Sequence, residues 1–499
     1  MDNLTVQEDH SIIPDATHSI KEMSEVLFVD MDGTLIRTDL LHESLVLLSK
    51  QSIWRFLRAL LSLIHGRAAF KKTISEAVSP EISQLPFRKE VIGCIKEQRA
   101  KGRKIILATA TDSAWAQSIA DELGLFDGIL ASDGVHNLKG TAKLEAIQKY
   151  CREHQYNHFD YLGDNYTDLP IWRKARSVYI VAPSPALMAK VRKFSEPAVI
   201  LGTWQSPILS ALSALRPQQW VKNILVFVPL LASHKVFTLP LVKLTAIAFV
   251  CFCCCASAGY VLNDLGDINS DRRHPTKRKR PFASGDLPIS WGLPLATLLL
   301  TISFTLSGLT LPTSFSVSLA AYFVITCVYS FYAKQIAMLD VIILAGLYTI
   351  RVFAGGMATA IVISEWLAAF CLFLFVSLAF AKRYAELERL FRANETLLSG
   401  RGYRISDITL IESIGSSSGY ISVLVLALYV NSGPMKMLYV NPWPLLLVCP
   451  ILMYWVSRVW IKAKRGELTE DPIVFALRDR ISIYLGIIVI ILFIAGSYM

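Results

Sequence analysis

The sequence predicts a multidomain protein. A Rossmann-like α/β domain with a helical cap is followed by an all-α polytopic membrane domain of about nine transmembrane helices. Short apolar runs that end in aspartate or threonine predict the parallel sheet of the first part. Long apolar runs after Arg216 predict the second part. The hydrophobic content of 53% and the mean hydropathy of +0.44 are too high for a soluble protein of 499 residues.

We expect a tail over 1–24, the α/β domain over 25–195 with its cap at about 40–99, a linker over 196–215, and the membrane domain over 216–499. The tail is polar and acidic and lacks the regions of a signal peptide, so we expect the α/β domain to be cytoplasmic. Much of the net charge of +10 lies in loops beside apolar runs, which indicates membrane orientation and attraction to membrane lipids rather than nucleic-acid binding.

The α/β domain begins with a strand predicted over Val26–Val29, because this short β-branched and apolar run is typical of a buried parallel strand. The strand ends in Asp30-Met31-Asp32-Gly33, so two carboxylates precede a glycine turn. Side chains at the carboxyl end of a parallel strand lie where α/β sheets bind ligands. Asp30 and Asp32 are therefore candidate site residues.

Further polar residues follow predicted strands or open a predicted helix, and their order along the chain is more specific than any one of them. They are Thr109 after the strand predicted over Lys104–Ala108, Lys143 at the start of the helix predicted before Tyr150, and Asp164 and Asp168 after the strand predicted over Phe159–Leu162. Parallel strands present these ends at one edge of the sheet, so we expect a single site.

These motifs resemble those of the haloacid dehalogenase-type phosphatase superfamily, over about residues 25–195. The resemblance implies that Asp30 is the nucleophile that forms an aspartyl phosphate, and that Asp32 is the general acid and base. The other implied roles are phosphoryl-oxygen binding by Thr109 and Lys143, with Lys139 as a rival for the lysine, and Mg²⁺ binding by Asp30, Asp164 and Asp168.

The predicted cap contains a basic and apolar helix over Trp54–Ile64, which includes Arg55 and Arg58. The resemblance to the haloacid dehalogenase-type superfamily implies that the cap selects the substrate. A basic, apolar cap suits contact with lipid or with a lipid-linked phosphate. An ordinary amphipathic cap helix explains the same pattern equally well.

Nine apolar runs after the linker are long enough to predict transmembrane spans. The loops between them are alternately rich in Lys and Arg, which predicts one orientation in the cytoplasmic (inner) membrane, with the basic loops on the cytoplasmic side. The predicted spans lie near 218–235, 240–262, 290–311, 313–333, 338–360, 364–381, 416–431, 442–461 and 480–498.

One loop carries a dense cluster of carboxylates and cations at the end of the second predicted span. Asp264, Asp267 and Asp271 follow Asn263 at steps of three and four, which predicts that they share one face of a helix. Mg²⁺ takes a few carboxylates and completes its shell with water and substrate phosphates. The nearby Arg272, Lys277 and Arg280 would bind phosphate oxygens. A solvated, positively charged cytoplasmic loop is the alternative, but it does not explain the spacing of the acids.

Ionisable residues inside or at the ends of spans are candidate functional residues, although some of them serve as snorkelling anchors. By contrast, the cysteines Cys251, Cys253, Cys254 and Cys255 lie within an apolar run as small hydrophobic residues. The ionisable candidates are Lys222, Lys334, Asp340, Arg351, Lys382, Arg383, Glu386, Arg478, Asp479 and Arg480.

The second part resembles the UbiA-type membrane prenyltransferase superfamily over about 215–499, and most closely its decaprenyl-phosphate phosphoribosyltransferase branch. The resemblance rests on 216–223, 263–281, 329–334, 351–356, 382–387 and 476–480. It implies phosphoribosyl pyrophosphate as donor, polyprenyl phosphate as acceptor and Mg²⁺ as cofactor. The substrate-binding residues that it implies are Lys222, Asn263, Arg272, Lys277, Arg280, Lys334, Asp340, Arg351, Lys382, Arg383, Tyr384 and Arg478.

One departure from the wider superfamily is informative. Aromatic prenyltransferases carry a second acidic motif, whereas the matching stretch here, Asp340 to Leu344, has a single acid. An enzyme that ionises a prenyl diphosphate benefits from two acidic clusters. One that binds a single diphosphate on a sugar needs only one, which favours the phosphoribosyl branch.

The sequence therefore predicts a bifunctional enzyme that transfers 5-phosphoribose to polyprenyl phosphate and then removes the 5-phosphate. One alternative is a transferase that moves a prenyl group from prenyl diphosphate to an aromatic or other small acceptor. A second is a transporter or scaffold with a fused phosphatase, which fits intramembrane charges but not the spaced acids.

Overall fold

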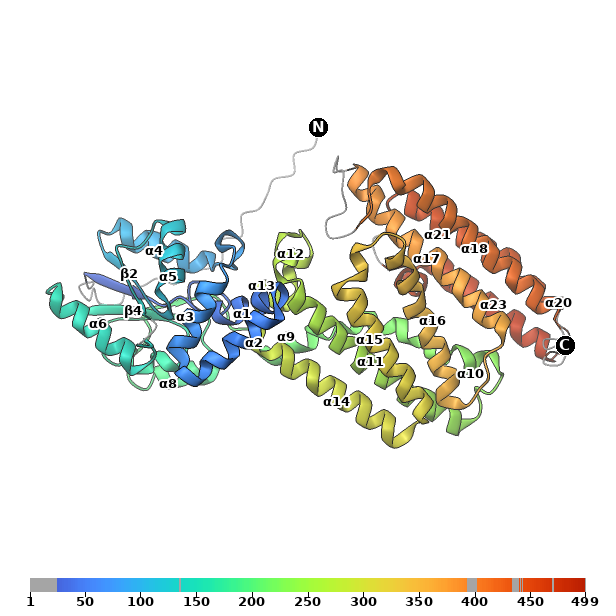
Figure 1. Cartoon of the computed structure of the whole chain (residues 1–499), viewed down its shortest axis with the longest axis horizontal. Helices are drawn as coiled ribbons and strands as arrows, with labels where there is room; N and C mark the ends of the chain where they lie inside the picture. Colours follow the sequence, from blue (N-terminus) through green and yellow to red (C-terminus); the bar gives the residue numbers. More distant parts are fainter. Residues whose placement is uncertain are drawn as a thin grey trace. The chain divides into compact units, whose positions relative to one another are not determined.

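The computed structural model describes residues 25–133, 136–392, 402–432, 439, 441, 443–468 and 471–498 (Figure 1). The predicted tail over 1–24 lies outside them. The chain divides into two compact units, Met1–Gln205 and Ser206–Met499, and the division falls inside the stretch expected to be a linker.

The first unit contains a six-stranded, all-parallel sheet in the order β3-β2-β1-β4-β5-β6. The three strands predicted from sequence are present, and β6 lies inside the expected linker. The strands are β1 (Val26–Val29), β2 (Lys104–Asp112), β3 (Gly128–Ser132), β4 (Phe159–Gly163), β5 (Val178–Val181) and β6 (Val199–Leu201).

Strand β1 lies inside the sheet, between β2 and β4, and all four of its residues are buried, on both faces of the sheet. Leu27 and Val29 belong to one apolar cluster, and Val26 and Phe28 to another on the opposite face. Val29 pairs in register with Leu107 of β2 and, on the other side, with Leu162 of β4. This register brings the carboxyl ends of β1, β2 and β4 to one edge, as the sequence predicts.

Helices cover the sheet, and the insertion between β1 and β2 is mostly helical, as predicted. Its helices are α1 (Leu40–Gln51), α2 (Ile53–Leu61), η1 (Ser62–His65), α3 (Arg67–Ala77), η2 (Ile82–Gln84) and α4 (Lys89–Ala100). Helix α4 leads into β2, and its Val91 and Ile95 pack in the same apolar cluster as the sheet residues. The later helices are α5 (Ser113–Leu123), α6 (Thr141–Glu153), η3 (Tyr166–Asp168), α7 (Leu169–Trp172) and α8 (Pro185–Val191).

The segment α2–η1 exposes several large apolar side chains. Ala59 is buried, but Trp54 is 79% exposed and Ile64 is 81% exposed. Arg55 and Arg58 are also exposed. The basic and apolar character expected of this cap helix is therefore displayed at its surface.

The second unit is helical, and among the described residues eight helices are long and apolar enough to cross a membrane. The predicted fold class is thus confirmed for both units. These spans are built on α11 (Leu239–Gly266), α14 (Gly292–Thr310), α15 (Thr313–Phe331), α16 (Leu339–Thr359), α17 (Glu365–Arg392), α18 (Ile408–Val430), α20–α21 (Trp443–Leu446 and Val448–Lys464) and α23 (Arg480–Tyr498).

The first of the nine predicted spans, near 218–235, is not a long helix. It forms η4 (Pro217–Phe227), a 3-10 helix, followed by the five-residue α10 (Val228–Ala232). Proline begins η4 and lies at the start of α10, and it supplies no backbone donor for a continuous helix. The other short elements are α9 (Pro207–Ala214), α12 (Ile268–Arg273), η5 (Lys277–Lys279), α13 (Pro281–Ser284), η6 (Ile289–Trp291), η7 (Ala333–Gln335), η8 (Ile405–Asp407) and α22 (Pro472–Arg478).

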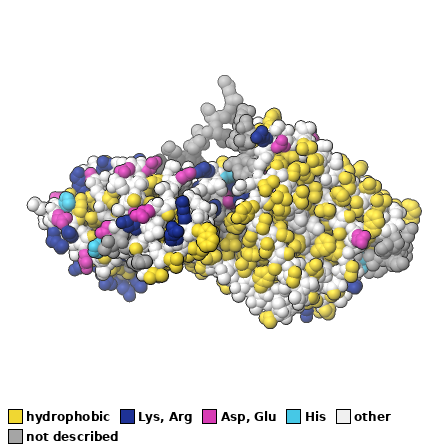
Figure 2. Space-filling view, viewed as in Figure 1, with side chains coloured by type: hydrophobic (Ala, Val, Ile, Leu, Met, Phe, Trp, Pro, Cys, Tyr) yellow, Lys and Arg dark blue, Asp and Glu magenta, His cyan; other side chains and the backbone are white. Residues whose placement is uncertain are grey.

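Helix α16 forms the centre of this unit. In its span 61% of the residues are buried, against 11% in that of α23. Its residues join two apolar clusters, one with α17, α18 and α21 and the other with α11 and α15. Gly355 of α16 permits the close approach of η4, because a Cβ there would lie 2.0 Å from the carbonyl oxygen of Val226. Hydrophobic side chains cover much of the visible face of this unit (Figure 2).

Candidate active sites

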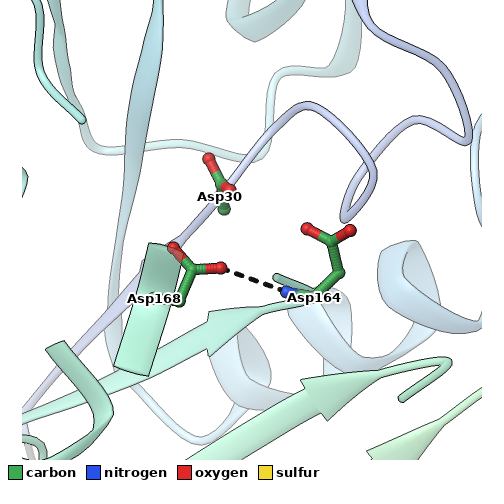
Figure 3. A group of neighbouring side chains, drawn as sticks. All are labelled: Asp30, Asp164 and Asp168. Carbon is green, nitrogen blue, oxygen red and sulfur yellow. Dashed lines mark hydrogen bonds between the residues drawn. The ribbon is translucent and has the colours of Figure 1, made fainter. Parts of the chain in front are cut away.

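Asp30, Asp164 and Asp168 form an acidic cluster at the carboxyl ends of β1 and β4. One carboxylate oxygen of each lies within 4.8 Å of the others (Figure 3). Among the described residues this is the one group of His, Cys, Asp and Glu with that property. Gly33 has a φ of +81°, and a Cβ there would lie 2.3 Å from Oδ2 of Asp164, so the turn leaves room for this carboxylate.

Hydrogen bonds hold these carboxylates in place. Lys143 Nζ donates to Oδ1 of Asp30 at 2.8 Å and lies 3.1 Å from the Tyr161 hydroxyl. Tyr161 in turn donates to Asp168 at 3.0 Å. Thr34 donates to Asp164 at 2.9 Å, and the backbone N–H groups of Asp164 and Asn165 donate to Asp168. The lysine that opens α6 is therefore in direct contact with the acid that ends β1.

The electrostatics of the cluster favour a bound cation. Burial, together with the charges of Asp168 and Asp30, raises the pKa of Asp164 well above its ordinary value. Burial and the charge of Asp30 raise the pKa of Asp168 to about 6, although Lys143 opposes them. Carboxylates that repel each other at this distance are the oxygen ligands that Mg²⁺ prefers. The three aspartates thus fit the metal-binding role that the sequence implies.

Asp32 lies apart from this group and has different contacts. Its Oδ1 accepts from the backbone N–H of Leu40 at 3.1 Å, and its Oδ2 accepts from the Thr111 hydroxyl. Burial, with the charge of Asp39, raises the pKa of Asp32 to about 7. A carboxyl group with such a pKa can both donate and accept a proton near neutral pH, which is the requirement for a general acid and base.

Thr109 is fully buried at the end of the straight part of β2, and its hydroxyl oxygen accepts from the backbone N–H of Thr111. Thr109 therefore supports the segment that holds Asp32. Lys143 contacts Asp30, as described above. Together these groups place a carboxyl group of raised pKa, Asp32, and an ammonium group, Lys143, with a carboxylate trio that includes Asp30, and this arrangement suits phosphoryl transfer.

The second acidic cluster, in the membrane unit, is built differently. Asp264 pairs with Arg216 and with Arg280, and Arg280 Nη1 lies 2.6 Å from Asp271. Asp267 pairs instead with Lys334 at 2.8 Å. Helix α11 ends at Gly266 and α12 begins at Ile268, so the expected single helix is interrupted at Asp267, although Arg280 contacts both Asp264 and Asp271.

One atom of this second cluster is left without a partner. Oδ2 of Asp264 is buried and accepts no hydrogen bond, while Oδ1 of the same residue accepts from two arginines. A buried carboxylate oxygen without a donor is costly. This orphaned oxygen fits a divalent cation that enters together with a phosphate-bearing ligand.

Asp340, the single acid of the second stretch, is fully buried in a separate ion pair. Its Oδ2 lies 2.8 Å from Nε of Arg383, and its Oδ1 accepts from the Tyr403 hydroxyl at 2.5 Å. Arg383 also pairs with Glu386. These partners leave Asp340 engaged with protein groups.

A further polar centre surrounds Asp471, which the sequence analysis missed. Asp471 contacts Lys222 and Lys382, two predicted binding residues, and the hydroxyl of Tyr348. Arg351 lies near this centre, where its Nε donates to Asn223 and its Nη2 to the Tyr322 hydroxyl. Asp471 follows Glu470 in a loop without a recognisable motif, so the sequence gave no reason to single it out, and its contacts are seen only in the structure.

The remaining predicted binding residues lie at several places in the membrane unit. Arg272 donates to the carbonyl oxygen of Ala283, and Tyr384 packs edge-on against Trp460 in the core. Lys277 and Arg478 are exposed, and Asn263 is half-buried at the end of α11.

Comparison with known proteins agrees with the division of the chain into two units. Residues 224–485 match the model of the UbiA prenyltransferase family, and residues 27–173 match that of the haloacid dehalogenase-like hydrolases. An uncharacterized protein, y4nM, of Sinorhizobium fredii is 36% identical over 93% of this chain and 89% of its own length.

Two other similarities concern the membrane unit. The decaprenyl-phosphate phosphoribosyltransferase of Corynebacterium glutamicum is 38% identical over 35% of this chain and 54% of its own length. A solved UbiA homologue from Archaeoglobus fulgidus, bound to GPP and Mg²⁺, matches with a TM-score of 0.43 at 15% identity, over 57% of this chain and 98% of that one.

The family match covers more than half of the chain, and the match to y4nM covers nearly all of it. Both units predicted from sequence are accounted for. The chain thus belongs to the UbiA prenyltransferase family and is an integral membrane protein, with a haloacid dehalogenase-like phosphatase domain ahead of its membrane helices.

Proposed function

We propose that the membrane unit transfers 5-phosphoribose from phosphoribosyl pyrophosphate to a polyprenyl phosphate, and that the first unit then removes the 5-phosphate. In the first reaction an oxygen of the lipid phosphate attacks C1 of the ribose, and the bond from C1 to the pyrophosphate oxygen breaks. In the second, water replaces the ribose at the phosphorus atom. The first unit lies on the cytoplasmic side in this proposal.

The observation that carries the proposal is the state of the two acidic stretches in the membrane unit. Asp264 retains an unpartnered buried oxygen, whereas Asp340 is closed within its pair with Arg383 and Tyr403. One stretch is thus available to a metal–diphosphate and the other is not. This suits a donor with a single diphosphate on a sugar, and the similarity to decaprenyl-phosphate phosphoribosyltransferases supports the same choice.

In the membrane unit, the residues at the end of α11 would bind the leaving group. Asp264, Asp267 and Asp271 would hold Mg²⁺, which supplies charge neutralisation of the pyrophosphate. Arg216, Arg280 and Lys334 already lie against these acids and would bind the phosphate oxygens.

In the first unit, the carboxylate of Asp30 would attack the phosphorus atom, and the bond to the 5-oxygen of the ribose would break. The proton of Asp32 would pass to that oxygen, and Asp32 would then accept a proton from the water that hydrolyses the aspartyl phosphate. Lys143 and Thr109 would hold the phosphoryl oxygens. Asp30, Asp164 and Asp168 would hold Mg²⁺, which offsets the negative charge in the transfer.

The test uses the full-length protein in detergent, with labelled phosphoribosyl pyrophosphate and a polyprenyl phosphate. We expect a labelled lipid that forms only with Mg²⁺ and carries no 5-phosphate. The Asp30→Asn protein should accumulate the lipid that retains it. If ribose never reaches the lipid, while prenyl diphosphate is consumed with an aromatic acceptor, the proposal fails and the alternative transferase activity replaces it.

A further inference from the structure

Asp471 is the centre of a buried set of charges that the acidic cluster at the end of α11 does not include. Its Oδ2 lies 2.9 Å from Nζ of Lys222 and 3.1 Å from Nζ of Lys382, and it accepts from the Tyr348 hydroxyl at 2.7 Å. These partners come from η4, α17 and α16, while Asp471 immediately precedes α22. Side chains from three separate elements therefore converge on one carboxylate oxygen.

The carboxylate is fixed in position. Three donors occupy its Oδ2, and its Oδ1 caps α22 by accepting from the backbone N–H of Ile473 at 3.2 Å. Burial alone would raise the pKa of Asp471, but Lys222, Lys382 and the Tyr348 hydroxyl bring it well below its ordinary value. Asp471 is thus a carboxylate whose position its three donors fix and whose charged form they favour.

The cations around it retain capacity for an anion. An ammonium group has three donors, and the contact with Asp471 uses one from each lysine. Arg351 lies within 6.0 Å of the Tyr348 ring, and Lys222 lies within 5.9 Å of the same ring. Two ammonium groups thus contact one carboxylate, and Arg351 lies beside the Tyr348 ring, so the set has surplus positive charge in a buried setting.

This set is separate from the acidic cluster at the end of α11. Lys222 follows Arg216, the partner of Asp264, by six residues of 3-10 helix, about 12 Å along its axis. Among the described residues, Asp471 is the one acid that pairs with Lys222 and Lys382, so this set lacks the several carboxylates that a metal-bound diphosphate would use.

We propose that Lys222 and Lys382 form a metal-free subsite for the phosphate group of a lipid-linked monophosphate, and that Asp471 is the residue that positions the two ammonium groups. The proposal rests on the proposed function, since it assigns a place to the acceptor. Surplus positive charge among apolar spans suits a phosphate attached to a membrane-embedded tail. The acidic cluster at the end of α11, in which three acids pair with three cations, suits a diphosphate that arrives with Mg²⁺.

Binding is measured first, without any reaction. Full-length protein in detergent is titrated with farnesyl phosphate in EDTA, with farnesol and inorganic phosphate as controls for the tail and the headgroup. Lys222→Met and Lys382→Met should each weaken farnesyl phosphate binding roughly tenfold or more, because each removes a charged donor. Asp264→Asn should leave it unchanged. Binding that requires Mg²⁺, or that is insensitive to both lysine changes, would overturn the subsite.

The positioning role is tested in the transfer reaction. Asp471→Asn should raise the KM for the lipid phosphate severalfold, with a smaller change in kcat and none in the KM of the donor. Asp471→Glu, which keeps the charge, should recover part of the loss. The matched control is Asp479→Asn, which breaks the pair with Arg458 just after α22.

The outcomes separate the two claims. If Asp479→Asn raises the same KM as much as Asp471→Asn, or if the donor KM rises equally, Asp471 acts only on folding and the positioning role is wrong. If phosphoribosyl pyrophosphate is not a donor at all but farnesyl phosphate still binds in EDTA through the two lysines, the proposed donor fails and the subsite stands.

Discussion

The two acidic sites of this chain use the same residue type in opposite electrostatic settings. In the first unit, Asp30 and Asp168 pair with one lysine, Lys143, whereas Asp32 and Asp164 accept from threonine hydroxyl groups. In the membrane unit, Asp264, Asp267 and Asp271 are each paired with Arg216, Arg280 or Lys334. The first site has a surplus of negative charge, and the second has balanced charge.

The difference indicates how each site acquires a metal ion. Carboxylates that repel one another gain from a divalent cation alone. A balanced cluster gains little from a bare cation, because the arginines and the lysine already neutralise the acids. It gains more from a metal bound to a diphosphate, because the diphosphate oxygens pair with the arginines and leave the carboxylates free to bind the metal. We therefore expect the first unit to bind Mg²⁺ alone and the membrane unit to bind it with its substrate.

The largest effect is expected from a substitution that inactivates the site of the first unit and leaves that of the membrane unit intact. Asp30→Asn removes the attacking oxygen's charge, so phosphate release should fall at least about a thousandfold. Transfer should remain within about twofold, because the two units have separate folds and separate acids. Parallel assays of phosphate release and lipid labelling check this. Loss of both activities in a folded protein would show that the sites are coupled.

Asp264→Asn is the reciprocal change. It removes the charge that faces two arginines and bears the unpartnered oxygen, so transfer should fall about a hundredfold or more, mainly in kcat. Asp267→Asn should act in the same direction. Phosphatase activity on an added substrate is the internal control and should not change. Near-normal transfer by both variants would refute the assignment of the acidic loop.

A metal titration sharpens the comparison directly. Mn²⁺ binding, followed by electron paramagnetic resonance, should show one site without substrate and a second only after pyrophosphate is added. We expect pyrophosphate to tighten the second site about tenfold or more, since it supplies the missing anionic ligands. Asp164→Asn should remove the first site alone. Two equivalent sites in the absence of pyrophosphate would contradict the electrostatic argument.

The smallest effect concerns the cap surface on α2. Charge reversal in the double variant Arg55→Glu, Arg58→Glu should reduce the preference for lipid-linked over free ribose 5-phosphate severalfold, since each basic residue near an anionic surface contributes about 1 kcal/mol. The Asp264→Asn background prevents formation of new lipid product. Lys72→Glu, on the neighbouring α3, is a control for charge alone. Equal hydrolysis of both substrates by the unchanged cap would refute lipid-linked specificity.

Much of the first unit could be read from the sequence because its signals are local. Each strand that carries a site residue is a short apolar run followed directly by that residue. Strands β3, β5 and β6 were not predicted, since none of them carries a predicted site residue, and β6 consists only of Val199–Leu201, inside the stretch expected to be a linker. The contacts of Tyr161 and Thr111 were also missed, since neither residue stands in a motif.

The membrane unit was predicted less completely, for a different reason. Apolar length identified eight spans, but Pro217 and Pro229 break the segment that was counted as a ninth. The spacing of Asp264, Asp267 and Asp271 indicated one helical face, whereas α11 ends at Gly266. Asp471 and Tyr348 lie 123 residues apart, so only the tertiary structure brings them together.

The close approach of Gly355 to η4 allows one feature of this packing to be checked in the sequences of related chains. Any side chain at that position would collide with backbone of η4, which flexible atoms cannot relieve. Because η4 carries both Arg216 and Lys222, a larger residue there would displace the two cations together. The residue at this position of α16 therefore serves as a marker. In a relative with alanine there, we expect η4, and with it the residues that correspond to Arg216 and Lys222, to lie elsewhere. The substrates of such a relative should not be inferred from those of this chain.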